Sequence, residues 1–137
     1  RVVCGAPSYL EQHGVPQTPA DLRQHQLVAS TSLSPTAEWV FLDQDERLAV
    51  KVQPRIVVNT NDGALEAARL GFGLARLLSY QLAPQLASGE LQTVLTDYEG
   101  PELPVHVIHR EGRHGSAKVR SFVDLAVDRL RANPALS

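Results

Sequence analysis

The feature that most constrains this 137-residue sequence is a repeated alternation between short apolar runs and segments that begin with helix-capping residues. The clearest unit is the β-branched run 55–59, which is followed by Thr60, Asn61 and Asp62. These three side chains can cap a helix, and Gly71 is suited to ending it. Alternation of this kind predicts an α/β fold with mostly parallel strand pairing.

The remaining segments follow the same pattern. A short helix is predicted from Pro7 to Gly14, and a second starts where Thr18 can cap Pro19. The strongest periodicity belongs to a C-terminal helix opened by Ser116, whose apolar residues recur every three or four positions. Further strands are predicted at residues 2–5, 27–29, 39–42, 48–52, 72–75, 91–95 and 105–108, and a further helix at 82–87.

Composition excludes some classes of protein. Hydrophobic residues make up 43% of the chain, which is enough for a core. The 13 Lys and Arg residues are outnumbered by 15 Asp and Glu residues, so this piece lacks the positive charge needed to bind a nucleic-acid backbone. A single cysteine, Cys4, forms no internal disulfide, and no apolar run is long enough to cross a bilayer. We therefore expect a cytoplasmic protein without membrane contact.

The chain contains no methionine and begins at Arg1. We therefore expect that a longer protein supplies residues upstream. The first five residues lack the charged head, apolar stretch and cleavage site of a signal peptide, so they give no indication of secretion.

Five histidines suggest a metal site, but their spacing does not favour one. His106 and His109 are three residues apart on a predicted strand and would point to opposite faces of it. His13 and His25 fall at predicted helix ends, where a cation interacts favourably with the last carbonyl groups. His114 lies in a polar loop. We expect no metal site and no cofactor.

Catalytic motifs are also absent from the sequence. The Ser30–Ser32 stretch has no Gly-x-Ser-x-Gly elbow and no nearby histidine or lysine to act as a base. Gly71 and Gly73 resemble the start of a dinucleotide fingerprint, but Arg76 occupies the position of the third glycine. We expect no enzyme activity and no catalytic residue.

Two polar stretches are candidate ligand sites, because each follows a predicted strand. Open α/β sheets bind ligands at the carboxyl ends of their strands. The second stretch precedes a helix, whose N-terminal N–H groups can receive an anion, although taken alone its side chains are better explained as helix caps. Arg76 could pair with an acidic ligand or simply be solvated. The candidate residues are Ser30, Thr31 and Ser32 in the first stretch and Thr60, Asn61 and Asp62 in the second.

An ordered series of short motifs also carries a resemblance to a known family. Each motif alone is common, and their order and spacing make the match specific. The series resembles the LysR-type transcriptional regulators, in particular their CrgA-like branch, over nearly the whole chain. The motifs are Ala6-Pro7-Ser8-Tyr9-Leu10, His13-Gly14, Pro16, Thr18-Pro19-Ala20-Asp21-Leu22, His25, Trp39-Val40-Phe41, Val58-Asn59, Ala67-Ala68, Gly71-Phe72-Gly73-Leu74-Ala75, Gly89-Glu90-Leu91, Val94-Leu95 and Val119-Arg120-Ser121-Phe122-Val123-Asp124.

The resemblance implies a two-lobed effector domain of the type 2 periplasmic-binding-protein kind, which binds a small molecule between its lobes. It assigns residues 1–25 and 104–137 to a partial first lobe and residues 26–103 to the second. The winged helix-turn-helix that binds DNA, and the N-terminal part of the first lobe, would lie outside this chain.

The same resemblance places Ser30, Thr31, Ser32, Thr60, Asn61 and Asp62 on the second lobe's side of the cleft. The expected ligand is a polar or acidic metabolite, and its binding would control DNA binding by the full-length regulator. DNA would be contacted only through the absent N-terminal domain. The alternative is a solute-binding protein of the same fold that serves a transporter, which would require export from the cell.

An incomplete first lobe would leave apolar surface exposed around Val105, Phe122 and Val123. We therefore expect copies of this chain to associate as a homodimer.

Overall fold

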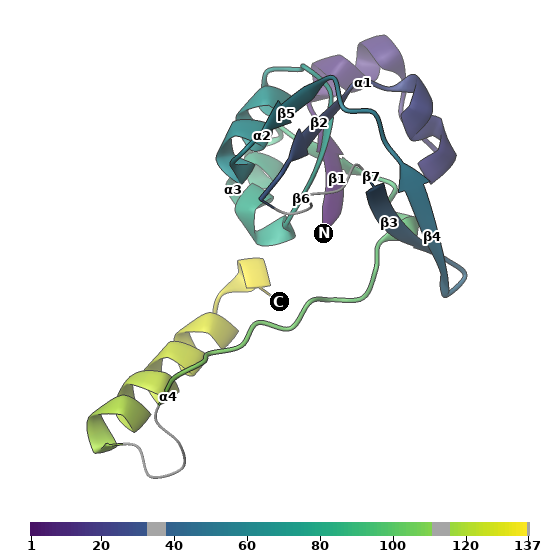
Figure 1. Ribbon diagram of the computed structural model, residues 1–137. Coiled ribbons are helices and arrows are strands. Elements are labelled where there is room, and N and C mark those ends of the chain that lie inside the picture. Colours follow the sequence, from purple (N-terminus) through teal and green to yellow (C-terminus); the bar gives the residue numbers. More distant parts are fainter. Residues whose placement is uncertain (33–37, 111–115, 137) are drawn as a thin grey trace. The chain divides into compact units, whose positions relative to one another are not determined.

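The computed structural model describes residues 1–32, 38–110 and 116–136. The loop expected around Ser34 to Thr36 and the loop that holds His114 lie outside these ranges. The chain divides into two compact units, Arg1–Pro101 and Glu102–Ser137 (Figure 1). Within the described part of the chain, none of the helices combines the length and apolar character needed to cross a bilayer.

A five-stranded sheet forms the centre of the first unit (Figure 1). Its order is β5-β2-β6-β1-β7, and β2 pairs in parallel with β5 and β6, whereas β1 pairs antiparallel with β6 and β7. The predicted parallel pairing therefore holds only around β2, because β1 enters the sheet in the opposite direction. The strands are β1 (Val2–Gly5), β2 (Leu27–Ser30), β5 (Ile56–Val58), β6 (Leu74–Leu77) and β7 (Gln92–Val94).

Helices and a hairpin cover the two faces of this sheet (Figure 1). One face packs against α2 (Asn61–Arg69) and α3 (Ser79–Ser88). The other packs against α1 (Pro7–His13), the 3₁₀-helix η1 (Pro19–Gln24) and the antiparallel hairpin of β3 (Glu38–Asp43) and β4 (Glu46–Lys51). A second 3₁₀-helix, η2 (Thr96–Tyr98), follows β7. This is the expected α/β class.

The side chains of each strand alternate between the two faces of the sheet, and apolar side chains are buried on both faces. In β1, Val3 contributes to the core beneath α1 and the hairpin, whereas Val2 and Cys4 contribute to the core beneath α2 and α3. Successive strand residues point to opposite faces, so an apolar run is favoured only where both faces are covered. Burial raises the pKa of the Cys4 thiol to about 12, and the thiol therefore stays protonated.

Residues 1–25 share a core with the middle of the chain. Tyr9 of α1 and Leu22 of η1 pack in the same cluster as Leu27 of β2 and Trp39 of β3. These contacts all lie within the first unit. The assignment of residues 1–25 and 104–137 to one lobe and 26–103 to another stays a prediction.

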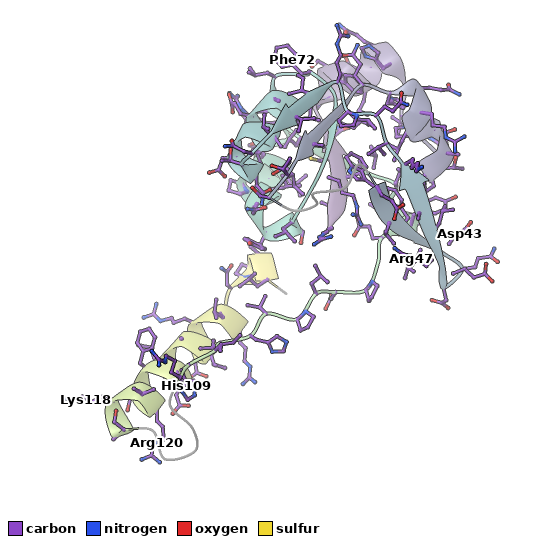
Figure 2. All side chains as sticks on the ribbon, in the orientation of Figure 1. Asp43, Arg47, Phe72, His109, Lys118 and Arg120 are labelled. Carbon is purple, nitrogen blue, oxygen red and sulfur yellow. The ribbon has the colours of Figure 1, made fainter. Side chains whose placement is uncertain are left out.

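The second unit contains α4 (Ala117–Arg131) and the short 3₁₀-helix η3 (Pro134–Leu136). Ser116 accepts a hydrogen bond from the Val119 N–H at 3.4 Å, so the predicted helix start is confirmed. Residues 105–108 form no strand, which makes that prediction wrong, because a strand needs a partner and none of the described residues pairs with this segment. Figure 2 shows this segment, with its side chains, as a stretch of chain outside any helix or strand.

The second unit exposes apolar side chains at two of the three positions expected from sequence. Val105 is 60% exposed and Phe122 is 69% exposed, whereas Val123 is half-buried. Ile108 and Leu125 add to this exposed apolar surface.

Gly73 is the glycine on which the packing of β6 depends most. Its φ of +152° is unfavourable for other residues, and a Cβ atom there would lie 2.4 Å from the Gln26 carbonyl oxygen. The close approach allows the Leu74 N–H to donate to that carbonyl at 2.8 Å, directly before β6 pairs with β2.

Replacing Gly73 by alanine should therefore lower the free energy of unfolding by about 2–4 kcal/mol, because backbone must move to relieve the clash. Trp39, the only tryptophan, is buried in the first unit and reports its unfolding in urea. Gly100→Ala is the matched control, because a Cβ there meets nothing within 4 Å. Equal urea midpoints for the two variants would contradict this account.

Candidate functional site

The two polar stretches singled out from sequence lie side by side at one edge of the sheet (Figure 1). β2 and β5 are parallel neighbours with Ser30 opposite Val58, so both strands end at the same level. The Thr31 N–H donates to the Val58 carbonyl at 2.9 Å, and the Ser32 hydroxyl donates to the Asn59 carbonyl. The turn after β2 is thereby fixed to the segment that leads into α2.

Within the first stretch the three side chains have different environments. Ser30 is only 7% exposed, and its hydroxyl accepts the Ser32 N–H at 3.3 Å, which tightens the turn. Thr31 and Ser32 are exposed, and each directs its hydroxyl proton to a backbone carbonyl. Their oxygens keep acceptor capacity on the exposed side of the turn.

The second stretch begins α2. Thr60 accepts the Gly63 N–H at 3.1 Å and is the helix cap that the sequence predicted. Asp62 is exposed in the first helical turn, near the positive end of the helix dipole. The Asn61 amide donates to Gln81 Oε1 at 3.2 Å, while its own Oδ1 is buried without a hydrogen-bond partner among the described residues. A buried acceptor of this kind costs free energy until a donor reaches it.

Gln81 is a site residue that sequence reasoning missed. It lies in the first turn of α3, which follows the carboxyl end of β6, the other parallel neighbour of β2. The carboxyl ends of β5, β2 and β6 and the starts of α2 and α3 therefore share one edge of the first unit (Figure 1). The helix was predicted to start only at Leu82; Ser79, at the actual helix start, was the signal available in the sequence.

We call the group formed by Ser30, Thr31, Ser32, Thr60, Asn61, Asp62 and Gln81 the carboxyl-edge cluster. Small hydroxyl and amide groups dominate it, with one carboxylate. It can donate and accept hydrogen bonds but contains no nucleophile paired with a base. Among the described residues, no group of three or more His, Cys, Asp or Glu side chains is placed to hold a metal ion.

Arg76 is not simply solvated, which was one of the two roles considered from sequence; pairing with an acidic ligand stays a prediction. Its guanidinium donates to the Val40 carbonyl at 2.6 Å and lies 5.2 Å from the centre of the Phe41 ring. Burial lowers the pKa of Arg76 to about 10. The side chain thus joins β6 to β3 of the hairpin, and this half-buried position explains why it is not simply solvated.

Comparison with known proteins gives the same family for most of the chain. Residues 1–131 match the model of the "LysR substrate binding domain" family. A similar curated protein is an uncharacterized HTH-type transcriptional regulator of Haemophilus influenzae, 32% identical over 114 residues. That match covers 83% of this chain and 40% of the relative, so the chain spans about two-fifths of the length of the curated relative.

Solved structures with a similar fold are also regulators. The regulatory domain of CrgA from Neisseria meningitidis has a TM-score of 0.74 at 21% identity, covering 93% of this chain and 63% of that one. Full-length AphB of Vibrio cholerae has a TM-score of 0.72 at 22% identity, covering 93% of this chain and 44% of that one. These likenesses show the fold: the α/β, periplasmic-binding-protein-like class expected from sequence is confirmed, and the chain is part of such a domain.

The capping role of Thr60 can be measured apart from any ligand. Thr60→Ala should lower the free energy of unfolding by about 1 kcal/mol, because the Gly63 N–H loses its acceptor. Thr60→Ser keeps the oxygen and should restore most of the loss in urea denaturation. If alanine and serine variants unfold at the same urea concentration as the parent, the hydroxyl does not hold the helix start.

Proposed function

Since this chain belongs to the LysR substrate-binding domain family, we propose that its carboxyl-edge cluster forms one side of an effector-binding site. The observation that carries the proposal is the pair of hydrogen bonds from Thr31 and Ser32 to Val58 and Asn59. They hold two polar stretches, distant in sequence, at the edge where open α/β sheets bind ligands.

The chemistry of the cluster favours a small polar metabolite, including an organic acid. Hydroxyl and amide side chains supply both donors and acceptors, and the positive ends of the α2 and α3 helix dipoles favour a carboxylate. The buried Oδ1 of Asn61, which has no donor among the described residues, would gain one from a ligand amide or hydroxyl. The first lobe of the intact domain would supply the opposite wall.

In the full-length protein, we expect this binding to regulate transcription. A ligand with different affinities for two arrangements of the lobes shifts their populations, and the shift can reposition DNA-binding domains supplied by the rest of the protein. Such a regulator acts where the chromosome is, in the bacterial cytoplasm. It performs no catalysis, because ligand binding itself is the signal.

The transporter alternative gains no support from the relatives and structures described above. All of them are transcriptional regulators. Binding of a solute without any effect on DNA binding by the full-length protein would be needed to revive it.

We also propose that copies of the chain associate through the second unit. Its extended segment and α4 line a cavity of about 510 Å³, and Val105, Val123 and Val127 are among the apolar residues of the lining. Ile108 is 89% exposed and Phe122 is 69% exposed beside these residues in sequence. Exposed apolar surface of this kind favours association in water.

The effector proposal can be tested on the full-length protein encoded by the gene. A thermal-shift screen against a panel of organic acids and amides should identify a ligand that also changes promoter binding. For that ligand, Ser32→Ala and Asn61→Leu should each raise the Kd by about tenfold, the loss expected for one hydrogen bond to a polar ligand.

Ser8→Ala is the control, because Ser8 is exposed on α1, away from the cluster. It should leave the Kd unchanged. A ligand that binds the parent, Ser32→Ala and Asn61→Leu equally well would show that the effector site lies elsewhere.

Self-association predicts a dimer of the 137-residue chain in light scattering at high concentration. Phe122→Asp should shift the mass toward the monomer, because it places a charge in the apolar surface. Val57→Asp, at an exposed valine of the first unit, is the matched control and should leave the dimer intact. A monodisperse monomer for the parent chain would contradict the proposal.

A further inference from the structure

A second cavity, of about 310 Å³, lies within the first unit and away from the carboxyl-edge cluster. It is lined by Leu22, Arg23 and His25, which precede β2, and by residues 51–53, which follow β4 and precede β5. Near these segments, the Arg55 N–H donates to the Leu27 carbonyl at 2.9 Å. The cavity therefore lies toward the amino-terminal ends of β2 and β5, opposite the ends that hold the cluster.

The lining of this cavity combines basic side chains with an apolar floor. Arg23 and Lys51 are exposed, and His25 is half-buried. Leu22 is 1% exposed and Val52 is 4% exposed, so the apolar part of the lining is well packed. Three basic groups over an apolar surface attract an anion more strongly than the same groups fully in water, because screening is weaker there.

The acidic side chains of the neighbouring elements are engaged elsewhere. The Asp21 carboxylate accepts the Thr18 and Gln17 N–H groups at 2.8 and 3.0 Å, and these backbone hydrogen bonds hold its pKa below the usual range. Glu38 is the cross-strand neighbour of Lys51, and its carboxylate lies 3.7 Å from Arg47. In the described ranges, neither Arg23 nor Lys51 has a carboxylate within ion-pairing distance.

The contact between His25 and Tyr9 uses Nδ1 of the ring, so Nε2 is the nitrogen that can serve a ligand. Nδ1 lies 3.1 Å from the Tyr9 hydroxyl, whose oxygen accepts the Gln26 N–H at 2.8 Å. The Tyr9 hydroxyl can donate its own proton to Nδ1. Neutral His25 then carries its proton on Nε2, which can donate to an anion.

We propose that this cavity binds a small oxyanion, the carboxylate or phosphate group of a metabolite, through Arg23, His25 and Lys51. Guanidinium, ammonium and imidazole donors form strong charge-assisted hydrogen bonds with such groups. The cavity volume is at the lower end of the range for ligand sites, which fits a small metabolite. The site is separate from the carboxyl-edge cluster and does not depend on the effector proposal.

Binding at this site should strengthen as the pH falls. The groups that face His25 are Tyr9 and His13 of α1, Asp21 and Arg23 of η1, and Lys51 of β4. Burial, and then the charge of His13, hold the pKa of His25 below 6.5, with Asp21 opposing them. An anion stabilises protonated His25, so affinity rises as the pH falls toward the lowered pKa of His25 and levels off once the imidazole is protonated in the free protein.

The test uses the 137-residue chain, labelled with ¹⁵N and titrated separately with inorganic phosphate and with succinate at constant ionic strength. The backbone amide chemical shifts of residues 22–25 and 51–53 should change with ligand concentration and reach saturation. The arm that saturates at lower concentration distinguishes a phosphate site from a carboxylate site. Arg23→Gln and Lys51→Met should each weaken binding by about tenfold, the effect of losing one charge-assisted hydrogen bond.

Arg120→Gln is the matched control, because Arg120 is an exposed arginine of α4 that does not line the cavity (Figure 2). It should bind as the parent does. Chemical-shift changes that grow linearly with ligand concentration, or that are spread over the whole surface, would show an adventitious ion only. Changes that are reduced equally in all three variants would show the same. Either outcome would overturn the proposal. Both cavity variants replace exposed residues, and the spectrum without ligand verifies that each is folded.

Discussion

The parallel pairing of β2 with β5 on one side and with β6 on the other organises the first unit. It sets the three carboxyl ends at one edge, where the starts of α2 and α3 follow β5 and β6. It also requires both faces of the sheet to be covered, because the strands are apolar on both sides. The approach of Gly73 to Gln26 keeps the β6 strand close enough for this pairing.

Most elements could be predicted because their signals are local. Thr60, Ser116 and Gly89 mark helix ends through their own side chains or backbone conformation, and the structure uses them in that way. The direction of β1 and the absence of a strand at 105–108 depend on partners distant in the sequence, which local patterns do not contain. For the same reason, Gln81 and the hairpin contact of Arg76 were not foreseen.

The candidate site could be predicted to a similar extent. Its two stretches were identified because polar residues followed predicted strands, and the structure places them together through Thr31 and Val58. A role in effector binding remains a proposal that rests on this geometry and on membership of the LysR substrate-binding domain family. The basic cavity near Arg23 and Lys51 was invisible in the sequence, since its two sides lie almost thirty residues apart.

The central claim is that the edge organised by β2 contacts the effector. The most direct measurement is a crystal structure of the complete regulatory domain with its effector bound. The account predicts ligand atoms within hydrogen-bond distance of the turn at residues 30–32 and of the first turn of α2. An effector that contacts neither segment would contradict it.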